Sequence, residues 1–562
     1  MPRTRLYRAT ALTTLVLSAF LTAHTTTAEP VPLADLTIVG RYESGIFDQS
    51  AAEIVAHDPA SQRLFVVNAK SGIDILDISD PTTPTKAGNI PVPPGFAGIN
   101  SVAVRNGQVA AAVEATSPTG NGAVFLYNTQ GKLKRIFPVG VLPDALAFTP
   151  DGNTIVVANE AQPDVQLDAD EEHVLTFHGD APGTISIIHI PDDTVTHINF
   201  EAYNQPAAEQ AFRNAGGILS LKDATLPGNP TISVAHDLEP EYIAITEDGK
   251  LAIVSVQENN ALAIVNLKTK TLQALTPLGF KDNTQPANAL DPSDRDDQIN
   301  LRTGPILSAF MPDTIDTFIK DGETYIITAN EGDARDFDIR RVKDLALDPG
   351  FDTSPYPNAK ALQDNAEFGR LEASLTGSDT NGDGQADRLV AFGTRSFSIF
   401  KLTENRLELI FDSGDQFERI TAERFPNHFN ASNDNNATEN RSDDAGPEPE
   451  AVTVAAIGSN HYAFIALERI GGILAYDITD PTNPTFLQYV NNRDFSQDIK
   501  ININGKKTFN RLAGDLGPEG LLYIAPQDSP DGQGLLVVAN EVSGTTTLYR
   551  VTQTHQHQTP GQ

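Results

Sequence analysis

The sequence contains no cysteine and no tryptophan, and it is poor in basic residues. Without cysteine, the chain has no disulfides, no thiolate metal ligands and no cysteine nucleophile. Lys and Arg number 40 against 74 Asp and Glu, which gives a formal net charge of −34. Nucleic acids and anionic membranes attract basic surfaces, so this balance argues against both as partners. It favours cations as partners, or serves solubility alone.

Long apolar runs are also scarce, and the one present lies at the N-terminus, from Ala9 to Ala23. Three arginines precede this run and small residues follow it at 26–28. This order predicts a secretory signal peptide over 1–28, and hence export to the periplasm or the extracellular space. A membrane anchor is the alternative, but the run is shorter than the about 20 residues that a span needs. After signal cleavage we expect no membrane span, a polar disordered tail over 552–562 and no C-terminal anchor.

The common hydrolase and nucleotide-binding motifs are missing as well. The sequence has no G-x-S-x-G, no H-E-x-x-H and no phosphate-binding P-loop. If the protein hydrolyses a substrate, we therefore expect metal-activated water, carboxylate ligands and an arginine that stabilises the oxyanion.

A repeated unit is present in place of these motifs. Each unit has an acidic residue or Asn, a short apolar strand, a turn, a second strand, and then Asn or Glu. Pro143-Asp144 leads in this way to Asn159-Glu160, and Glu239-Pro240-Glu241 leads to Gln257-Glu258. Seven units recur, about 45 residues apart where nothing is inserted. They predict an all-β chain folded as a β-propeller of about seven blades (six to eight), with an array of β-sandwiches as the alternative.

One domain is expected to fill 29–551, with an eighth unit possible over Leu371–Gly414. The last unit shows three strands, so a strand at Leu36–Tyr42 is expected to close the ring. Polar insertions interrupt the repeat near 164–183, 281–305, 332–369 and 412–447. The Asn- and Asp-rich stretch 427–446 within the last of them is expected to be partly disordered.

The most specific local motif predicts a calcium-binding loop. Oxygen-bearing side chains alternate along it, and Gly384 allows a sharp turn at its sixth position. The predicted ligands are Asp379, Asn381, Asp383, Gln385 and Asp387. No Glu stands at the twelfth position, so a helix–loop–helix hand is not expected. The alternative is a polar turn in which Asp and Gly serve geometry alone.

A second candidate site follows from the repeat, because equivalent positions of the blades of a propeller converge on its axis. One predicted layer contains Asp144, Glu241, Asp313, Glu450 and Glu519. A second predicted layer contains Glu114, Glu160, Glu258, Glu331, Glu468 and Glu541. Like carboxylates at close range require cations, basic partners or raised pKa values. The candidate internal partners are Arg335, Arg395 and Arg469, and the alternative is that the carboxylates only cap turns and pair with amides or with these arginines.

From these layers we assign Glu331, Glu468, Glu519 and Glu541 as further metal ligands. The expected ion is Ca²⁺, with a second divalent or transition metal as an additional candidate. If the protein is an enzyme, the catalytic candidates are Glu450, Glu241, Asp313, Arg395 and Arg469.

Several stretches resemble the choice-of-anchor I family, in order over about residues 35–551. They are Asp237–Tyr242, Leu278–Asp282, Thr328–Arg335, Phe392–Phe397, Arg441–Glu450, Ala466–Gly472, Gly517–Gly520 and Ala539–Thr545. The resemblance implies an exported β-propeller whose means of surface anchoring varies between members. Relatives include cell-surface glycoproteins of biomineralising animals, associated with calcium carbonate, and proteins labelled alkaline phosphatases.

Two hypotheses follow. The first is an exported calcium-binding propeller that acts as a cell-surface, periplasmic or matrix binding protein, with mineral or matrix components as partners. The alternative is a metal-dependent alkaline phosphomonoesterase that acts on phosphate esters with the axial carboxylates and arginines.

Overall fold

A computed structural model describes residues 33–168, 174–228, 230–354, 356, 361–404, 406–503 and 505–554. The predicted signal peptide, 1–28, lies outside the described residues, as does most of the predicted tail. Strand pairing continues to Thr554, three residues into the stretch predicted as a tail.

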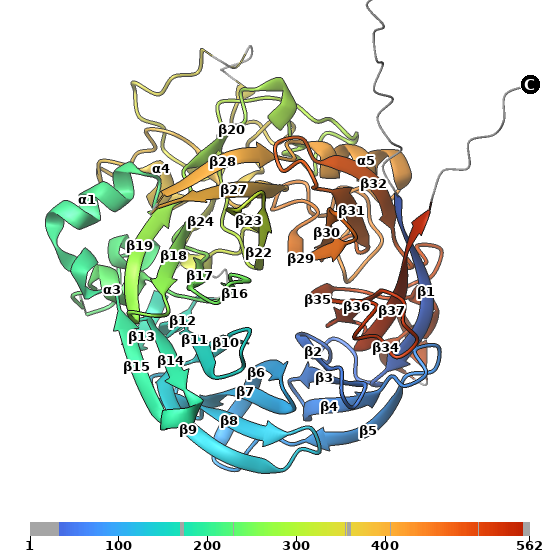
Figure 1. The fold of residues 1–562 in the computed structure, drawn as a ribbon. Coiled ribbons are helices and arrows are strands. Elements are labelled where there is room, and N and C mark those ends of the chain that lie inside the picture. Colours follow the sequence, from blue (N-terminus) through green and yellow to red (C-terminus); the bar gives the residue numbers. More distant parts are fainter. Residues whose placement is uncertain are drawn as a thin grey trace, which may run out of the picture.

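Seven four-stranded antiparallel sheets are arranged around a central axis (Figure 1). Blade 1 contains β2 (Val55–Asp58), β3 (Arg63–Asn68), β4 (Gly72–Asp77) and β5 (Thr85–Ile90). Blade 2 contains β6 (Phe96–Arg105), β7 (Gln108–Ala115), β8 (Asn121–Asn128) and β9 (Leu133–Val141). Blade 3 contains β10 (Pro143–Phe148), β11 (Thr154–Asn159), β14 (Thr184–His189) and β15 (Thr194–Asn199). Blade 4 contains β16 (Ile243–Ile245), β17 (Leu251–Val256), β18 (Ala261–Asn266) and β19 (Thr271–Pro277).

The remaining three blades follow the same order from the axis outward. Blade 5 contains β22 (Ile315–Lys320), β23 (Glu323–Ala329), β27 (Phe397–Thr403) and β28 (Arg406–Asp412). Blade 6 contains β29 (Pro449–Ile457), β30 (Asn460–Leu467), β31 (Ile473–Asp477) and β32 (Thr485–Val490). Blade 7 contains β35 (Pro518–Ile524), β36 (Leu535–Asn540), β37 (Thr545–Thr554) and β1 (Leu33–Glu43).

The blades form a complete ring. The inner strand of each blade contacts the inner strand of the next, and β35 of blade 7 contacts β2 of blade 1. The N-terminal strand β1 pairs with β37 and so completes the last blade with residues from the other end of the chain. The predicted β-propeller is therefore confirmed.

The core lies between adjacent blades. Phe65 of β3 and Val113 of β7, from neighbouring blades, belong to one buried cluster, and Phe464 of β30 packs with Leu536 of β36. The second strand of a blade is covered on both faces, so it is apolar throughout, as in the run Ile155–Ala158 of β11. The outermost strand is exposed, as β5 shows.

The expectation of an eighth unit at Leu371–Gly414 is wrong. Strands β27 and β28 of that stretch are the outer strands of blade 5, because β27 pairs with β23. The insertion after β23 separates the second and third strands of this blade, and its Val390–Ala391 strand joins another sheet. Blade-like apolar runs therefore occur there without a new blade.

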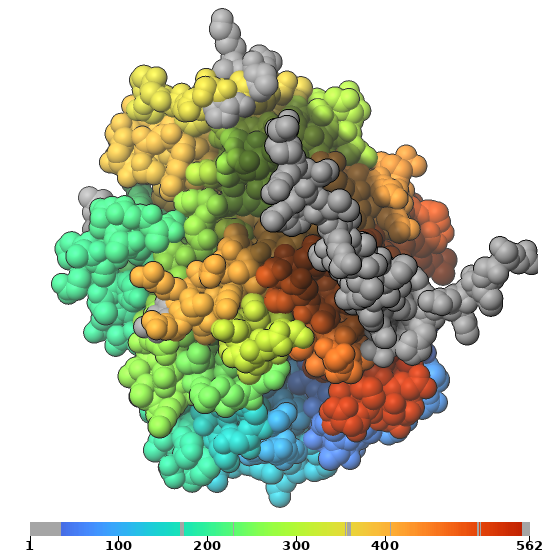
Figure 2. Space-filling model, turned by 45° about the horizontal axis from the view of Figure 1, so that its top comes forward, coloured from blue at the N-terminus to red at the C-terminus, as the bar shows by residue number. Residues whose placement is uncertain are grey.

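That other sheet and a few short elements make up the insertions. The five-stranded sheet contains β20 (Phe280–Asp282), β21 (Leu307–Ala309), β26 (Val390–Ala391), β25 (Glu372–Ser374) and β24 (Ile339–Arg341). Two hairpins are β12 (Asp164–Leu167) with β13 (Val174–Gly179), and β33 (Lys500–Ile503) with β34 (Lys506–Phe509). The helices are α1 (Pro206–Asn214), α2 (Ser220–Asp223), α3 (Val234–Asp237), α4 (Leu375–Ser378) and α5 (Gln416–Arg424). Figure 2 shows yellow and orange segments of these insertions spread over one face of the molecule.

The expected disorder at 427–446 is also wrong. Asn430 and Ser442 in this stretch are fully buried and Asp443 is nearly so. Their polar groups bond to one another and to neighbouring segments, for example Arg370 to Asp443. Composition alone indicated a solvated loop, whereas these long-range bonds give its Asn and Asp side chains fixed partners.

A buried carboxylate, that of Asp515, joins the two strands that close the ring, β1 and β37. Asp515 accepts bonds from Arg41 of β1 at 2.6 Å and from Thr545 and Thr547 of β37 at 2.8 and 2.5 Å. We expect Asp515→Ala to lower the free energy of unfolding by about 3 kcal/mol, because it removes the buried acceptor of three hydrogen bonds and leaves Arg41 with the more exposed Glu43 as its ion-pair partner. The control Glu43→Gln removes only a more exposed partner of Arg41 and should cost about 0.5 kcal/mol or less. Urea denaturation measures both, and equal losses would contradict this role for Asp515.

Candidate functional site: an acidic cavity on the propeller axis

A proline followed by an acidic residue begins the inner strand of several blades. Three strands start at such a proline, namely β10 at Pro143, β29 at Pro449 and β35 at Pro518. In each, the register shifts directly after the proline, as a β-bulge does. Proline, which lacks an N–H, is tolerated at a strand start, and a bulge frees the next side chain from the sheet and re-aims it. The freed residues are Asp144, Glu450 and Glu519.

The second layer of acidic residues follows the ends of second strands, where buried asparagines hold the backbone. Asn159, at the end of β11, donates to Ser186 at 2.9 Å and accepts from the Gly140 amide at 3.0 Å. Asn330 occupies the corresponding place in blade 5 and donates to Ser398 at 2.8 Å. The next residue in each case, Glu160 or Glu331, enters the axial space.

Both layers meet in one cavity of about 450 Å³, which we call the axial cavity. Eleven carboxyl groups, two glutamines and one arginine line it. They are Asp144, Glu160, Glu241, Glu258, Asp313, Glu331, Asp333, Glu450, Glu468, Glu519, Glu541, Gln162, Gln257 and Arg469. Of the residues predicted for the two layers, Glu114 alone is not in this lining.

Burial and mutual repulsion govern the charge state of the cavity. Burial raises the pKa of Asp313 to about 6 and the pKa of Asp144 to about 7, the latter also through repulsion from Asp313. Burial, and then repulsion from Glu331 and Glu519, raises the pKa of Glu450 well above its ordinary range. One carboxylate oxygen each of Glu241, Glu258 and Glu450 is buried without a hydrogen-bond partner. The cavity therefore contains more carboxyl groups than the one arginine of its lining can neutralise.

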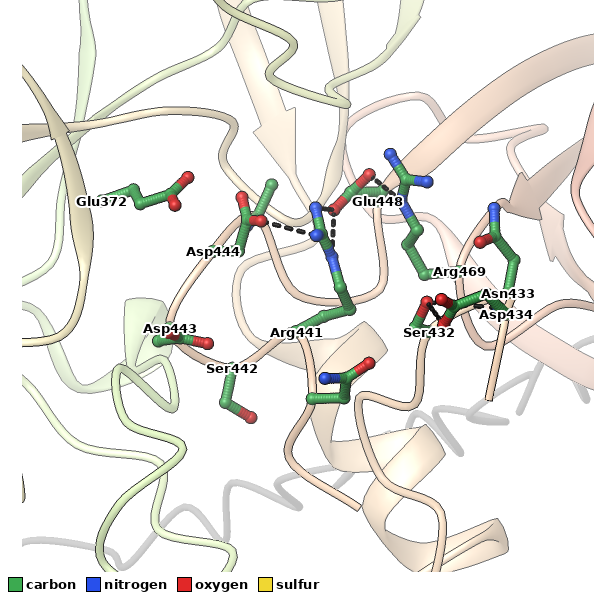
Figure 3. A network of polar contacts seen from close by, with 12 residues as sticks. Glu372, Ser432, Asn433, Asp434, Arg441, Ser442, Asp443, Asp444, Glu448 and Arg469 are labelled. Atoms are coloured by element: carbon green, nitrogen blue, oxygen red, sulfur yellow. Dashed lines mark hydrogen bonds and ion pairs between the residues drawn. The ribbon is translucent and has the colours of Figure 1, made fainter. Parts of the chain in front are cut away.

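Three groups of acidic residues bring ligand atoms within 4.8 Å of one another. In the group Glu331, Glu448 and Glu468, the chain supplies its own cations. Arg469 pairs with Glu448, and with Glu468 at 2.8 Å. Arg441 pairs with the other oxygen of Glu448, so Glu448 lies between two guanidinium groups (Figure 3).

The group Glu160, Glu239 and Glu258 also has an internal cation, which is Arg335. The buried Arg335 lies 2.9 Å from Glu239 and 3.0 Å from Asp237. Among the described residues, by contrast, no lysine, arginine or histidine pairs with the third group, Asp313, Glu450 and Glu519. These residues, which we call the inner triad, begin or precede the inner strands β22, β29 and β35.

The three predicted arginines have different places. Arg469 lines the axial cavity, and Arg335 pairs with acidic residues beside it. Arg395 does not line the cavity. Its guanidinium donates to Glu418 at 2.7 Å and to backbone carbonyl oxygens of Asp291, Ser442 and Asp444. It therefore binds the insertions together.

Sequence reasoning missed Glu448, Glu239 and Asp333 as members of the site. The repeated Glu-Pro-Glu at 239–241 and 448–450 contains a usable signal, because in both copies the first Glu pairs with an arginine near the axis. Nothing in the repeat marks Asp333, which follows the second-layer residue Glu331 at the start of an insertion.

The predicted calcium loop lies away from the axis, between α4 and β26. Asp379 accepts from the Gly382 and Gly384 amides, both at 2.7 Å, and Asp387 accepts from the Thr380 amide and hydroxyl. With Arg213 of α1, the loop borders a cavity of about 680 Å³. These bonds agree with a calcium loop and with a polar turn alike, so calcium binding here stays a prediction.

Comparison with known proteins identifies the family. The choice-of-anchor I domain matches residues 53–481, and the chain belongs to this family. Gigasin-3a of Magallana gigas is 31% identical over 196 residues, which are 34% of this chain and 67% of that protein. The mesenchyme-specific cell surface glycoprotein of Strongylocentrotus purpuratus is 28% identical over 329 residues, which are 52% of this chain and 41% of that protein.

Solved structures align with this chain at low similarity. The β-propeller domain of Myceliophteria thermophila Cps50 (Swd1) aligns over 92% of this chain and all of that one, with 10% identity and a TM-score of 0.41. Kuenenia stuttgartiensis hydrazine synthase aligns over 91% of this chain and all of that one, with 10% identity and a TM-score of 0.42. The propeller assignment therefore rests on the sheets of this chain. Within the described residues, no helix has the length and apolar character needed to cross a membrane.

The charge of the axial cavity predicts how stability changes with pH. In the folded protein the pKa is raised to about 6 for Asp313, about 7 for Asp144 and about 8 for Glu468. In the unfolded chain these carboxyl groups have pKa values near 4. The folded state binds more protons in this window, so the free energy of unfolding falls as pH rises from about 5 to 8. Chemical denaturation with chelator present measures the slope.

The control for this slope is Glu450→Gln, which removes one ionisable group of the cavity. Because glutamine has no proton to release, the variant should lose less stability over the same pH interval than the parent. A parent slope of zero, or an equal slope in both proteins, would contradict the raised pKa values.

Proposed function

We propose that this protein is an exported, surface-associated β-propeller that binds divalent cations, calcium above all, in its axial cavity. The observation that carries the proposal is the inner triad: three clustered carboxyl groups that no cation of the described chain neutralises. The other two groups each have an arginine, so the inner triad is where an external cation offsets the most repulsion.

The ligand chemistry favours a hard cation. Every group of the inner triad offers carboxylate oxygens, and no histidine lines the axial cavity. Ca²⁺ takes six to eight oxygen ligands at about 2.3–2.6 Å, so two oxygens on one ion are separated by at most about 5 Å. The ligand atoms of the inner triad lie within 4.8 Å of one another, which satisfies that limit. Imidazole and thiolate, the ligands that favour zinc or copper, are lacking in the lining, so we propose no transition metal here.

Export and surface association have separate support. The N-terminal pattern is that of a signal peptide, the family is named for its choice of anchor, and one relative is named a cell surface glycoprotein. Because the chain matches less than half of that relative's length, its cellular role is not transferred in detail. We propose mineral or matrix components as partners of the cation-loaded face.

The phosphomonoesterase alternative is less favoured, and the arginines are the reason. An oxyanion needs a guanidinium that faces the cavity and has donors free. Both terminal nitrogens of Arg335 are engaged with Asp237, Glu239 and Ser220, and Arg395 is buried in the insertions. Arg469 alone faces the axial cavity, and it already pairs with Glu448 and Glu468. Metal-dependent turnover of p-nitrophenyl phosphate that Glu450→Gln abolishes would reverse this preference.

The inner triad gives a direct test of cation binding. We expect Glu450→Gln to weaken Ca²⁺ binding at the axis at least tenfold, because it removes one of three charged ligands from an otherwise unneutralised group. The rise in melting temperature with Ca²⁺ should shrink accordingly, since a ligand at 100 times its dissociation constant stabilises by about 2.7 kcal/mol. Calorimetric titration after chelator treatment measures the affinity.

The matched control is Glu408→Gln, an exposed glutamate on the outer strand β28. It makes the same charge change far from the axis and should leave both affinity and melting temperature as in the parent. Parent-like binding in Glu450→Gln would remove the inner triad as the site.

We further propose that the Asp379 loop binds a calcium ion of its own. Here a gain of charge distinguishes a calcium loop from a polar turn. Asn381→Asp adds a carboxylate at the third ligand position, so a calcium loop should bind Ca²⁺ several-fold more tightly. A polar turn would gain only repulsion with Asp379, Asp383 and Asp387. Titration of Asn381→Asp in the Glu450→Gln background isolates this loop, and an unchanged affinity would contradict the proposal.

A further inference from the structure

A second group of buried acidic residues lies in the insertions, outside the axial cavity. Its members come from segments far apart in the chain: Asp291 from 281–305, Glu418 from α5, and Asn430 with Glu439 from 427–446. Asp291 and Asn430 have no exposed surface, Glu418 is 1% exposed and Glu439 is 8% exposed. We call this group the insertion cluster.

Hydrogen bonds link the members of the insertion cluster one after another. The Asp291 amide donates to Glu418 Oε2 at 3.3 Å, and Asn430 Nδ2 donates to Glu418 Oε1 at 2.9 Å. Asn430 Nδ2 also donates to Ser442 Oγ at 3.0 Å, and Ser442 Oγ in turn donates to Glu439 Oε2. The side chains of Glu418, Asn430 and Glu439 therefore share one buried polar space, and the backbone of Asp291 borders it.

The charges of this space do not balance. Glu418 has a cation, because Arg395 lies 2.7 Å from it. Asp291 accepts only from the Asn300 amide at 2.6 Å and, more weakly, from the Ser293 amide at 3.4 Å. Among the described residues, neither Asp291 nor Glu439 pairs with a lysine, arginine or histidine. Two buried carboxyl groups thus lack a counter-charge, and removing such groups from water is costly.

Two ligand atoms in this space are also without partners. Asn430 Oδ1 and Glu439 Oε1 are buried and accept no hydrogen bond. The other atom of each group is bonded inside the cluster, through Nδ2 of Asn430 and Oε2 of Glu439, so both free oxygens belong to the same space. The Asp291 amide and the Asn430 side chain bond to the two oxygens of the same Glu418 carboxylate, so Asp291 lies beside this space. Burial, and then repulsion from Asp291, raises the pKa of Glu439 to about 8.

We propose that Asp291, Glu439 and the Oδ1 atom of Asn430 bind a divalent cation of the hard, oxygen-preferring class, with Ca²⁺ as the probe ion. Such an ion would offset both uncompensated charges and supply the missing partner of each free oxygen. It would join the insertion 281–305 to the stretch 427–446.

This ion would act on the axial cavity only through the backbone. Ser442 of the insertion cluster adjoins Arg441, whose guanidinium pairs with Glu448 at the cavity (Figure 3). An ion bound to the cluster would therefore fix the segment that carries Arg441. The two sites share no ligand, so each can be removed without the other.

The experiment counts calcium equivalents on the whole chain by equilibrium dialysis with radioactive Ca²⁺ after chelator treatment. Glu439→Gln is expected to bind one equivalent fewer than the parent and to melt at a lower temperature in saturating Ca²⁺. In chelator it should be at least as stable as the parent, because the substitution removes an unpaired buried charge. Glu423→Gln, at an exposed position of the same helix α5 as Glu418, is the control and should keep every equivalent.

Two further variants keep the test decisive. Glu450→Gln should retain the equivalent that Glu439→Gln loses, so that failure of the axial site and failure of this one are distinguishable. Asn430→Asp supplies a charged oxygen at the free ligand position and should bind Ca²⁺ more tightly while being less stable in chelator. An unchanged number of equivalents in Glu439→Gln, or unchanged affinity in Asn430→Asp, would overturn the proposal and leave protonation as the way the cluster is neutralised.

Discussion

Repulsion among carboxylates on the axis is the constraint on which the rest of this structure depends. A propeller brings the same position of every blade to one place, so a residue type repeated in the sequence becomes concentrated in space. Eleven acidic side chains line about 450 Å³. In water their repulsion would be screened, but burial removes that screening and raises their pKa values. Arginines beside the cavity supply counter-charge, and the second strands with their buried asparagines hold the backbone in place against this repulsion.

The arginines that offset this repulsion are distributed unevenly around the ring. Arg335 neutralises part of the side formed by blades 3 and 4, and Arg469 with Arg441 does so beside blade 6. The inner triad, carried by blades 5, 6 and 7, has no such partner among the described residues. The backbone before Glu160 and Glu331 is held by apolar second strands and buried asparagines, so these carboxylates cannot relax apart at low cost. This pre-arrangement is typical of a binding site rather than of a surface that repels itself.

Repetition made the fold and most of the cavity predictable from sequence. Proline–acid pairs and the Asn–Glu ends of second strands recur in order, so a propeller is sufficient to bring Asp313, Glu450 and Glu519 together. The failures have a common cause, which is that contacts between insertions obey no repeat. Arg395 follows a strand as Arg469 does, yet it binds carbonyl oxygens of two other segments. The stretch 427–446 has the composition of a solvated loop, yet Asn430 and Ser442 are buried by partners that local sequence does not reveal.

The two acidic groups differ in access, and this difference separates their roles. The axial cavity opens to solvent and its lining includes half-buried members such as Glu160 and Glu541, so an ion there can exchange and can be shared with a ligand from outside. The insertion cluster is buried throughout, so an ion there would exchange only when the insertions separate. An open site of this kind suits reversible binding at a surface, whereas a closed one suits permanent cross-linking of a loop. On the two proposals above, the excess of acid in the sequence would serve two purposes: capture of cations at the axis and, through the closed site, stability of the segment that carries Arg441 to that axis.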